Sequence, residues 1–282
     1  MSYETYLAGD PVIVTAALTG GVHGKEANPN VPETPEEIGR AAGAVEAAGA
    51  SVVHLHARRP NGERSFETER FQEIDDAVRR HTDDVVIQHS TGGTGAPEAD
   101  RHLPLRTDPP PEMASLDMGP LNRYDHLTSE NTRGLVDSLH AEMVDRGIKP
   151  ELEVFNDGHR NEVYGLLDRR SLADPVYATL IFGPGTLTRP RPENFLTAIG
   201  DLPDGALFNT LGFGRHQLPF AAMGLLFGGH VRVGLEDNVY YRRGEPAESN
   251  VQLVERVVRL AEELGRPVAT TDEARSILGL DG

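Results

Sequence analysis

The segment SVVHLHARRP, from Ser51 to Pro60, carries two histidines separated by one leucine at the end of an apolar run. Side chains alternate between the two faces of a β-strand, so His54 and His56 would point to the same side and reach one shared atom. Two imidazoles in this arrangement suit a borderline divalent metal such as zinc. The alternative is a half-buried strand end whose two histidines only make structural hydrogen bonds.

An acidic pair near the C-terminus could complete such a site. Glu236 ends another apolar run, HVRVGLE, and is the best candidate for a third ligand. Two imidazoles and one carboxylate leave a coordination position open, which is typical of catalytic zinc. Zinc, or another divalent metal, could polarise a substrate carbonyl there and stabilise an enolate. Glu236 and Asp237 could instead form an acidic turn that caps the following helix.

Two other groups at strand ends could hold an anionic substrate. Ser90, Thr91 and Gly93 form a small turn whose hydroxyls and backbone amides could accept a carboxylate, although they also suit an ordinary glycine turn. Arg232 is expected to share a strand face with Glu236, and an inward-facing arginine needs a partner or a ligand. Asp237 is the expected partner.

Other polar residues near strand ends have weaker indications of function. The segment from Gly212 to Arg215 precedes a helix and could bind phosphate, or its glycines could serve only a tight turn. His89, His159 and His216 either line the site or cap turns, and the capping role is favoured.

The elements that must position these residues alternate regularly along the chain. Short apolar runs, each followed by a turn and a helical pattern, predict eight strands at the spacing of βα units. We expect them at residues 12–18, 51–56, 84–90, 112–118, 151–156, 176–182, 206–211 and 230–236. Eight alternations without a linker favour one (β/α)8 TIM barrel over residues 1–282, with a doubly wound sheet as the alternative. In a barrel, the carboxyl ends of the strands meet at one face, where catalytic residues gather.

Helices are expected between these strands. Thr34, Pro35 and Glu37 form a capping box with proline at the first helical position, which predicts a helix beginning there. Six more helices are expected at residues 66–81, 132–146, 160–169, 192–199, 217–227 and 250–264. The segment 92–111, rich in proline and glycine, is expected to be a loop with at most a short helix.

Composition excludes several classes of function. The formal charge of −17 disfavours nonspecific binding to nucleic acid or to an anionic membrane. The chain has no cysteine, so neither disulfides nor thiolate metal sites are possible. No segment has the length of a membrane span or the pattern of a signal peptide, so a cytoplasmic location is expected.

Six segments in this order resemble the β-keto acid cleavage enzymes, the family of 3-keto-5-aminohexanoate cleavage enzyme. They are TAALTGG, NPNVPETPEEI, AGASVVHLHAR, QHSTGG, PELEVFNDGH and GHVRVGLEDN. The resemblance implies a zinc-dependent barrel, usually a homotetramer, which converts a β-keto acid and acetyl-CoA into acetoacetate and a new CoA ester. A zinc-dependent aldolase or hydrolase that needs no CoA is the alternative, and a third is a barrel that only binds a small carboxylate.

The resemblance also implies roles for individual residues. His54, His56 and Glu236 would be the metal ligands, and Ser90 with Thr91 and Gly93 would bind the substrate carboxylate. Arg232 and Asp237 would promote deprotonation, and Glu153 would occupy a polar position in the active site. The aminohexanoate-type members use a glutamate shortly after the first strand to bind the substrate ammonium group. Here that stretch is GGVHG, so we expect no ammonium group in the same place.

Overall fold

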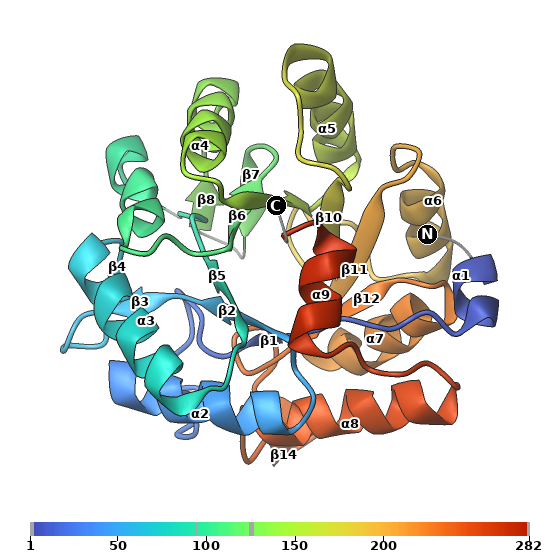
Figure 1. Ribbon diagram of the computed structural model, residues 1–282, viewed down its shortest axis with the longest axis horizontal. Helices are drawn as coiled ribbons and strands as arrows, with labels where there is room; N and C mark the ends of the chain where they lie inside the picture. The colour runs from blue at the N-terminus through green and yellow to red at the C-terminus, as the bar shows by residue number, and fades with distance from the viewer. Residues whose placement is uncertain (1–2, 94, 124–126, 281–282) are drawn as a thin grey trace.

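Eight parallel strands close into a barrel in the computed structural model, which describes residues 3–93, 95–123 and 127–280 (Figure 1). Around the barrel the order is β1, β12, β11, β10, β9, β6, β5, β2 and back to β1. The strands are β1 (Val14–Ala17), β2 (Val52–Leu55), β5 (Val86–His89), β6 (Met113–Asp117), β9 (Lys149–Val154), β10 (Tyr177–Phe182), β11 (Leu207–Gly212) and β12 (His230–Val233). This closed order confirms the predicted barrel and excludes the doubly wound sheet.

Each barrel strand coincides with or overlaps one of the eight apolar runs. Of the eight strands, β9 begins before its predicted start, because its first residue is Lys149, two residues earlier. The Lys149 ammonium group is buried, and it donates hydrogen bonds to the carbonyl oxygens of Ala173 at 3.2 Å and Pro175 at 2.6 Å. A charged side chain with these two acceptors can therefore occupy a strand position that composition alone would assign to a turn.

Helices surround the barrel and connect its strands (Figure 1). They are α1 (Tyr3–Ala8), α2 (Pro35–Ala47), α3 (Thr68–His81), α4 (Arg133–Asp145), α5 (Asp157–Arg169), α6 (Pro192–Gly200), α7 (Gln217–Leu226), α8 (Asn250–Glu263) and α9 (Thr271–Leu278). The predicted capping box is present, because the Thr34 side chain accepts from the backbone of Glu37 and the Glu37 side chain accepts from that of Thr34. The small residues of α2 allow it to pack closely against α3. A Cβ on Gly39, for example, would lie 2.7 Å from the Ala77 carbonyl oxygen.

Several elements were not predicted. Among the described residues, three two-stranded hairpins follow barrel strands. The helices α1 and α9 were also not predicted, because each has too few periodic apolar residues to indicate a helix. The hairpins pair β3 (Ala57–Arg58) with β4 (Arg64–Ser65), β7 (Leu121–Arg123) with β8 (Leu127–Ser129), and β13 (Tyr240–Arg242) with β14 (Glu245–Pro246). The described part of segment 92–111, which omits residue 94, contains the 3-10 helix η1 (Glu98–Arg106), in agreement with the expected loop with at most a short helix. A second 3-10 turn, η2 (Gly214–His216), precedes α7.

Helix α9 packs against the amino-terminal ends of the barrel strands. Ala274 and Leu278 form one buried apolar cluster with residues at or next to the starts of five strands. Those residues are Ile13, Val52, Val86, Met113 and Tyr177. Figure 1 shows α9 lying across this end of the barrel. The fold therefore closes one end of the barrel with a helix and leaves the other end for chemistry.

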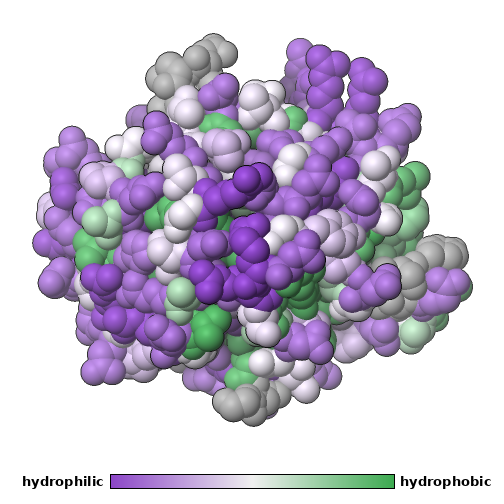
Figure 2. Space-filling view, turned by 90° about the horizontal axis from the view of Figure 1, so that it is seen from above, coloured by the Kyte–Doolittle hydropathy of each residue, from purple (hydrophilic) through white to green (hydrophobic). Residues whose placement is uncertain are grey.

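The face of the molecule seen in Figure 2 is predominantly hydrophilic. Figure 2 shows one side of the molecule, where hydrophobic residues occur only in small separate groups. Among the described residues, no helix combines the length and the apolar character needed to cross a membrane.

The turn after β12 depends on a glycine. Gly234 has φ of +151°, and a Cβ at this position would lie 2.0 Å from the carbonyl oxygen of Ala17. That same oxygen accepts a hydrogen bond from the backbone N–H of Glu236 at 3.2 Å. A side chain here would therefore push apart β1 and the turn that carries Glu236 and Asp237.

We expect Gly234→Ala to destabilise the protein by about 3 kcal/mol or more, because backbone strain and a backbone clash act together. Gly205→Ala is the matched control: Gly205 has φ of +77° but no atom within 4 Å of a Cβ. The control should cost about 1 kcal/mol from backbone strain alone. Urea unfolding measures both free energies, and equal values for the two variants would contradict the proposed clash.

Candidate active site

A pocket opens at the carboxyl ends of the barrel strands, where the sequence predicts the chemistry. Its polar lining includes six of the nine predicted site residues, namely His54, His56, Ser90, Glu153, Arg232 and Glu236. They come from β2, β5, β9, β12 and the segments that directly follow these strands. Barrel closure thus brings together residues separated by up to 182 positions in the sequence.

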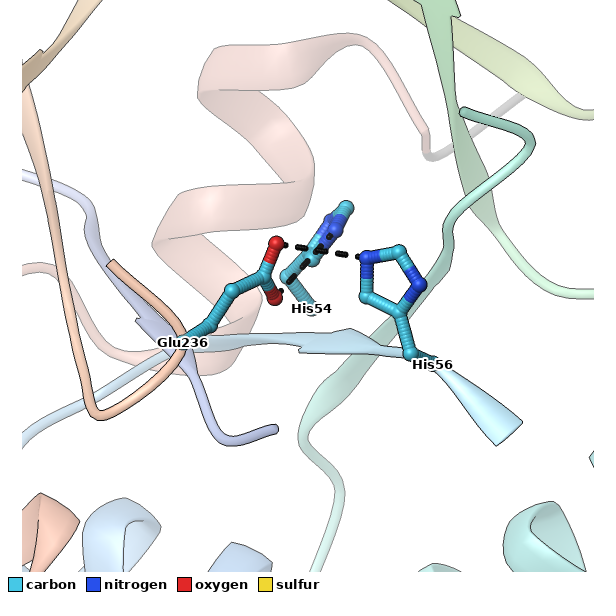
Figure 3. Close-up of side chains that lie close together, drawn as sticks. All are labelled: His54, His56 and Glu236. Carbon is cyan, nitrogen blue, oxygen red and sulfur yellow. Dashed lines mark hydrogen bonds and ion pairs between the residues drawn. The ribbon is translucent and has the colours of Figure 1, made fainter. Parts of the chain in front are cut away.

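His54, His56 and Glu236 face one another in this pocket (Figure 3). The Nε2 atom of His56 lies 3.2 Å from Oε1 of Glu236, and Nε2 of His54 lies 3.7 Å from Oε2 of the same carboxylate. One possible ligand atom from each residue lies within 4.8 Å of the others. The strand alternation therefore places both imidazoles on the same side, as the sequence predicts.

Neighbouring groups fix the orientation of these ligand atoms. Nδ1 of His54 donates to Oε1 of Gln88 at 2.7 Å, which leaves the lone pair of Nε2 directed at Glu236. The Glu236 Oε2 atom is buried and has no hydrogen-bond partner among the described residues. Gly20 makes room for this carboxylate, because a Cβ there would lie 2.8 Å from Cγ of Glu236. An orphaned carboxylate oxygen facing an imidazole lone pair is a suitable arrangement for a cation.

Burial keeps both imidazoles neutral. Desolvation, followed by the positive charge of Arg232, lowers the pKa of His54 well below its usual value. Desolvation lowers the pKa of His56 to about 4, although Glu236 opposes this shift. Burial also opposes ionisation of Glu236, but His56, Arg232 and His54 together lower the pKa of its carboxyl group. At neutral pH the three residues therefore offer two neutral nitrogens and one carboxylate.

Arg232 forms ion pairs with three carboxylates at the base of the pocket. Its guanidinium nitrogens lie 2.8 Å from Glu236 Oε1, 3.0 Å from Asp237 Oδ2 and 3.3 Å from Glu153 Oε1. Asp237 accepts a second bond through Oδ1 at 3.3 Å, so the predicted pairing of Arg232 with Asp237 is present. The arginine is 3% exposed, and a buried guanidinium needs such partners.

Glu153 differs from Glu236 in the direction in which its surroundings shift the pKa of its carboxyl group. Burial and the adjacent Asp117 on β6 raise the pKa of Glu153 well above its usual value, despite the opposing charge of Arg232. Glu153 therefore loses its proton less readily than an ordinary glutamate. By formal charge, Arg232 with the carboxylates of Glu236 and Asp237 carries one net negative charge, which a divalent cation would convert into one net positive charge. The site fits such a cation and, with it, an anionic substrate.

Only one of the three residues predicted to bind the substrate carboxylate lines the pocket. Ser90 lines the pocket, whereas Thr91 and Gly93 do not. The Thr91 hydroxyl donates to the carbonyl oxygen of Ser115 at 2.6 Å, and a Cβ on Gly93 would lie 2.7 Å from Cδ of Arg101. Thr91 and Gly93 therefore shape the turn that carries Ser90.

The three other histidines considered from the sequence, His89, His159 and His216, lie outside the pocket lining. His89 is fully buried and contacts Oδ1 of Asp75 and the carbonyl oxygen of Pro104, both at 2.7 Å. His159 contacts the carbonyl oxygen of Pro120 at 3.2 Å. His216 borders a neighbouring cleft. His89 and His159 therefore hold the loops of Pro104 and Pro120 in place through hydrogen bonds.

Sequence reasoning missed Arg64, which reaches the pocket from β4. Its Nη2 lies 3.2 Å from Nδ1 of His56 and also donates to the carbonyl oxygen of Gly92. A neutral imidazole that binds a cation through Nε2 carries its proton on Nδ1, so Arg64 would have to move away from Nδ1 of His56 when a cation binds. No spacing in the sequence indicates this contact, because it depends on the β3–β4 hairpin folding back over the barrel.

Comparisons with known proteins agree with this geometry. The family model described as beta-keto acid cleavage enzyme matches residues 11–280. A 3-keto-5-aminohexanoate cleavage enzyme of Acetoanaerobium sticklandii is 42% identical over 96% of this chain and 99% of its own. A 3-oxoadipate:acetyl-CoA acetyltransferase of Cupriavidus necator is 36% identical over 96% of this chain and 95% of its own. The solved ternary complex of ObcA with a C4-CoA adduct and oxalate shares the fold, with a TM-score of 0.75 and 21% identity over 89% of this chain and 68% of that chain.

We expect zinc affinity to change less than tenfold between about pH 7.5 and about pH 5.5, because the imidazoles stay neutral over this range. Two histidines with the ordinary pKa of about 6.5 would lose about 100-fold in affinity through proton competition. Calorimetric titration of the metal-free protein in a non-coordinating buffer measures the affinity. His56→Ala should abolish binding at both pH values, and a 100-fold loss in the unmodified protein would contradict the neutral state.

Proposed function

The chain belongs to the β-keto acid cleavage enzyme family, and on this premise we propose that it cleaves a β-keto acid with acetyl-CoA as co-substrate. The products would be acetoacetate and a new acyl-CoA. The observation that carries the proposal is the buried group of His54, His56, Glu236 and Arg232 at the carboxyl ends of the strands.

We propose that His54, His56 and Glu236 hold a divalent metal, with zinc as the first candidate because imidazole and carboxylate ligands suit it. When bound, the metal would act as a Lewis acid toward the keto and carboxylate oxygens of the substrate. The name of the Cupriavidus necator relative supports the use of acetyl-CoA.

The overall reaction balances without an oxidant or another co-reactant. A proton leaves the carbon between the keto and carboxylate groups, and that carbon forms a bond to the acetyl carbon of acetyl-CoA. The CoA thiolate leaves and adds to the original keto carbon. The bond between the original keto carbon and the newly acetylated carbon then breaks. The acetylated carbon takes up one proton, which balances the proton lost in the first step, and leaves as acetoacetate, while the other acyl group stays on CoA.

The surrounding residues take different roles in this proposal. Burial opposes the charge of Arg232, but Asp237 and Glu236 raise the pKa of its guanidinium well above its usual value. Arg232 is therefore a poor base, but its charge can stabilise negative charge that develops on the substrate. Asp237 holds the guanidinium through two hydrogen bonds and is either the proton acceptor or the group that orients Arg232. Glu153 has a raised pKa and could donate a proton near the pocket, and Ser90 would donate its hydroxyl hydrogen bond to the substrate carboxylate.

A second cleft beside the pocket supports the binding of acetyl-CoA. It shares His23, Pro184, Phe213 and Glu236 with the pocket, and Arg189, Arg191 and Arg215 also border it. Within the described residues these three arginines are exposed, and no ion pair to a carboxylate involves them. Arginine guanidinium groups suit phosphate oxygens, which CoA carries on its nucleotide half. This placement also agrees with the phosphate role considered for the segment from Gly212 to Arg215.

We also propose a homotetramer in the cytoplasm, since the resemblance to the family implies this assembly. Size-exclusion chromatography with light scattering tests the assembly.

We expect the zinc-loaded protein to form acetoacetate and a new CoA ester from a β-keto acid only when acetyl-CoA is present. His56→Ala should lower kcat/KM at least about 1,000-fold, because it removes a proposed metal ligand. Circular dichroism should show that this variant remains folded. Undiminished cleavage without acetyl-CoA would favour a CoA-independent aldolase or hydrolase, and binding of the acid without turnover would favour a purely binding role.

We expect the triple variant Arg189→Ala, Arg191→Ala, Arg215→Ala to raise KM for acetyl-CoA at least about tenfold, because it removes the proposed phosphate contacts. Turnover of S-acetylpantetheine, which lacks the nucleotide half, should be unchanged. Arg259→Ala is the matched control, since Arg259 lies on α8 with its side chain 56% exposed. An unchanged KM for acetyl-CoA in the triple variant would exclude this cleft as the phosphate site.

A further inference from the structure

One half of the pocket is apolar. Phe155, Ile181, Leu187 and Leu211 belong to a small buried cluster, and Phe213 packs against it. All five residues line the pocket. We call this set the apolar wall. Core residues normally lie between sheet and helices, so an apolar cluster that faces a pocket at the catalytic end of a barrel indicates contact with a ligand.

The apolar wall comes from consecutive strands. Phe155 follows β9, Ile181 lies on β10 and Leu211 lies on β11, while Leu187 and Phe213 lie in the segments that follow. Ile181 and Leu211 are direct partners in the register of β10 and β11. In the barrel order β10 lies four strands from β2 in either direction, which places it directly across from His54. The pocket therefore has a polar half and an apolar half that face each other.

The charged groups of the pocket lie outside the apolar wall. Among the described residues, its titratable lining consists of His23, His54, His56, Arg64, Glu153, Arg232 and Glu236. None of these residues lies on β10 or β11. Glu153 is the titratable residue nearest in sequence to the wall, and its carboxyl group contacts Arg232. A charged group placed against the wall would lose its water without gaining a partner of opposite charge.

We propose that the substrate is a β-keto acid whose substituent beyond the keto group is uncharged and aliphatic, and that the apolar wall selects it. This inference rests on the proposed function, because it assigns the reacting keto and carboxylate groups to the polar half. The substituent then extends from the keto carbon toward Ile181 and Leu211. The wall excludes a charged substituent by desolvation and accepts an aliphatic one by contact.

Three β-keto acids of equal chain length test the proposal with the zinc-loaded protein and acetyl-CoA. They are 3-oxohexanoate, which has an uncharged tail, 3-keto-5-aminohexanoate, which has a cationic tail, and 3-oxoadipate, which has an anionic tail. We expect kcat/KM for 3-oxohexanoate to exceed both others by about 100-fold or more. A charged acid that is used as well as 3-oxohexanoate, or better, would overturn the proposal.

A charge introduced into the wall should change this preference. Leu211→Arg should lower kcat/KM for 3-oxohexanoate about tenfold and raise it for 3-oxoadipate about tenfold. Because Leu211 is only 1% exposed, Leu187→Arg is made in parallel at a position in the connection after β10 that is 7% exposed. Leu196→Arg is the matched control, since Leu196 lies on α6 and is 48% exposed. Folded wall variants with the same preference as the control would overturn the proposal.

A failure of the proposed function gives a different result. In that case none of the three acids yields a CoA ester. Calorimetric competition then measures the relative affinities of the zinc-loaded protein for the three acids, and these affinities test whether the apolar wall selects the substituent. Tighter binding of 3-oxohexanoate would support the apolar wall as the selecting element. Equal or tighter binding of a charged acid would overturn it.

Discussion

The buried guanidinium of Arg232 is the interaction on which the site depends. It lies between carboxylates from β9 and from the turn after β12, and it contacts Glu153, Glu236 and Asp237. Breaking a buried ion pair by removing one partner typically costs about 3 to 5 kcal/mol. Because Glu236 is held by Arg232 and also faces both imidazoles, the charge of one strand residue helps to position the carboxylate of the proposed ligand set.

Burial has opposite effects on the groups around this charge, and the combination suits catalysis. It lowers the pKa of His54 and His56 and raises the pKa of Glu153, so neutral nitrogens and a carboxyl group that loses its proton less readily than usual lie in one site. Divergent environments of this kind are how enzymes assign different tasks to chemically similar side chains. The depth of the site in the barrel mouth therefore sets the pKa values of its side chains as well as their positions.

Much of the fold and of the polar half of the site could be predicted from the sequence, for a physical reason. Strand alternation fixes the face of His54 and His56, and barrel closure brings strand ends together regardless of their sequence separation. Ile181 and Leu211 could not be recognised as pocket residues, because apolar residues in a strand look the same whether they contact a helix or a ligand. Likewise, spacing could not show that the Thr91 hydroxyl bonds to Ser115 behind the pocket or that Arg64 reaches it through a hairpin.

The position of α9 has a consequence for how the molecule is made. Ala274 and Leu278 cover strand ends whose residues are synthesised much earlier, beginning with Ile13 and Val52. During translation these apolar strand ends remain uncovered until residues 271–278 leave the ribosome. The nascent chain therefore lacks the cover for this apolar surface until nearly all of it has been synthesised, and transiently exposed apolar surface of this kind favours aggregation.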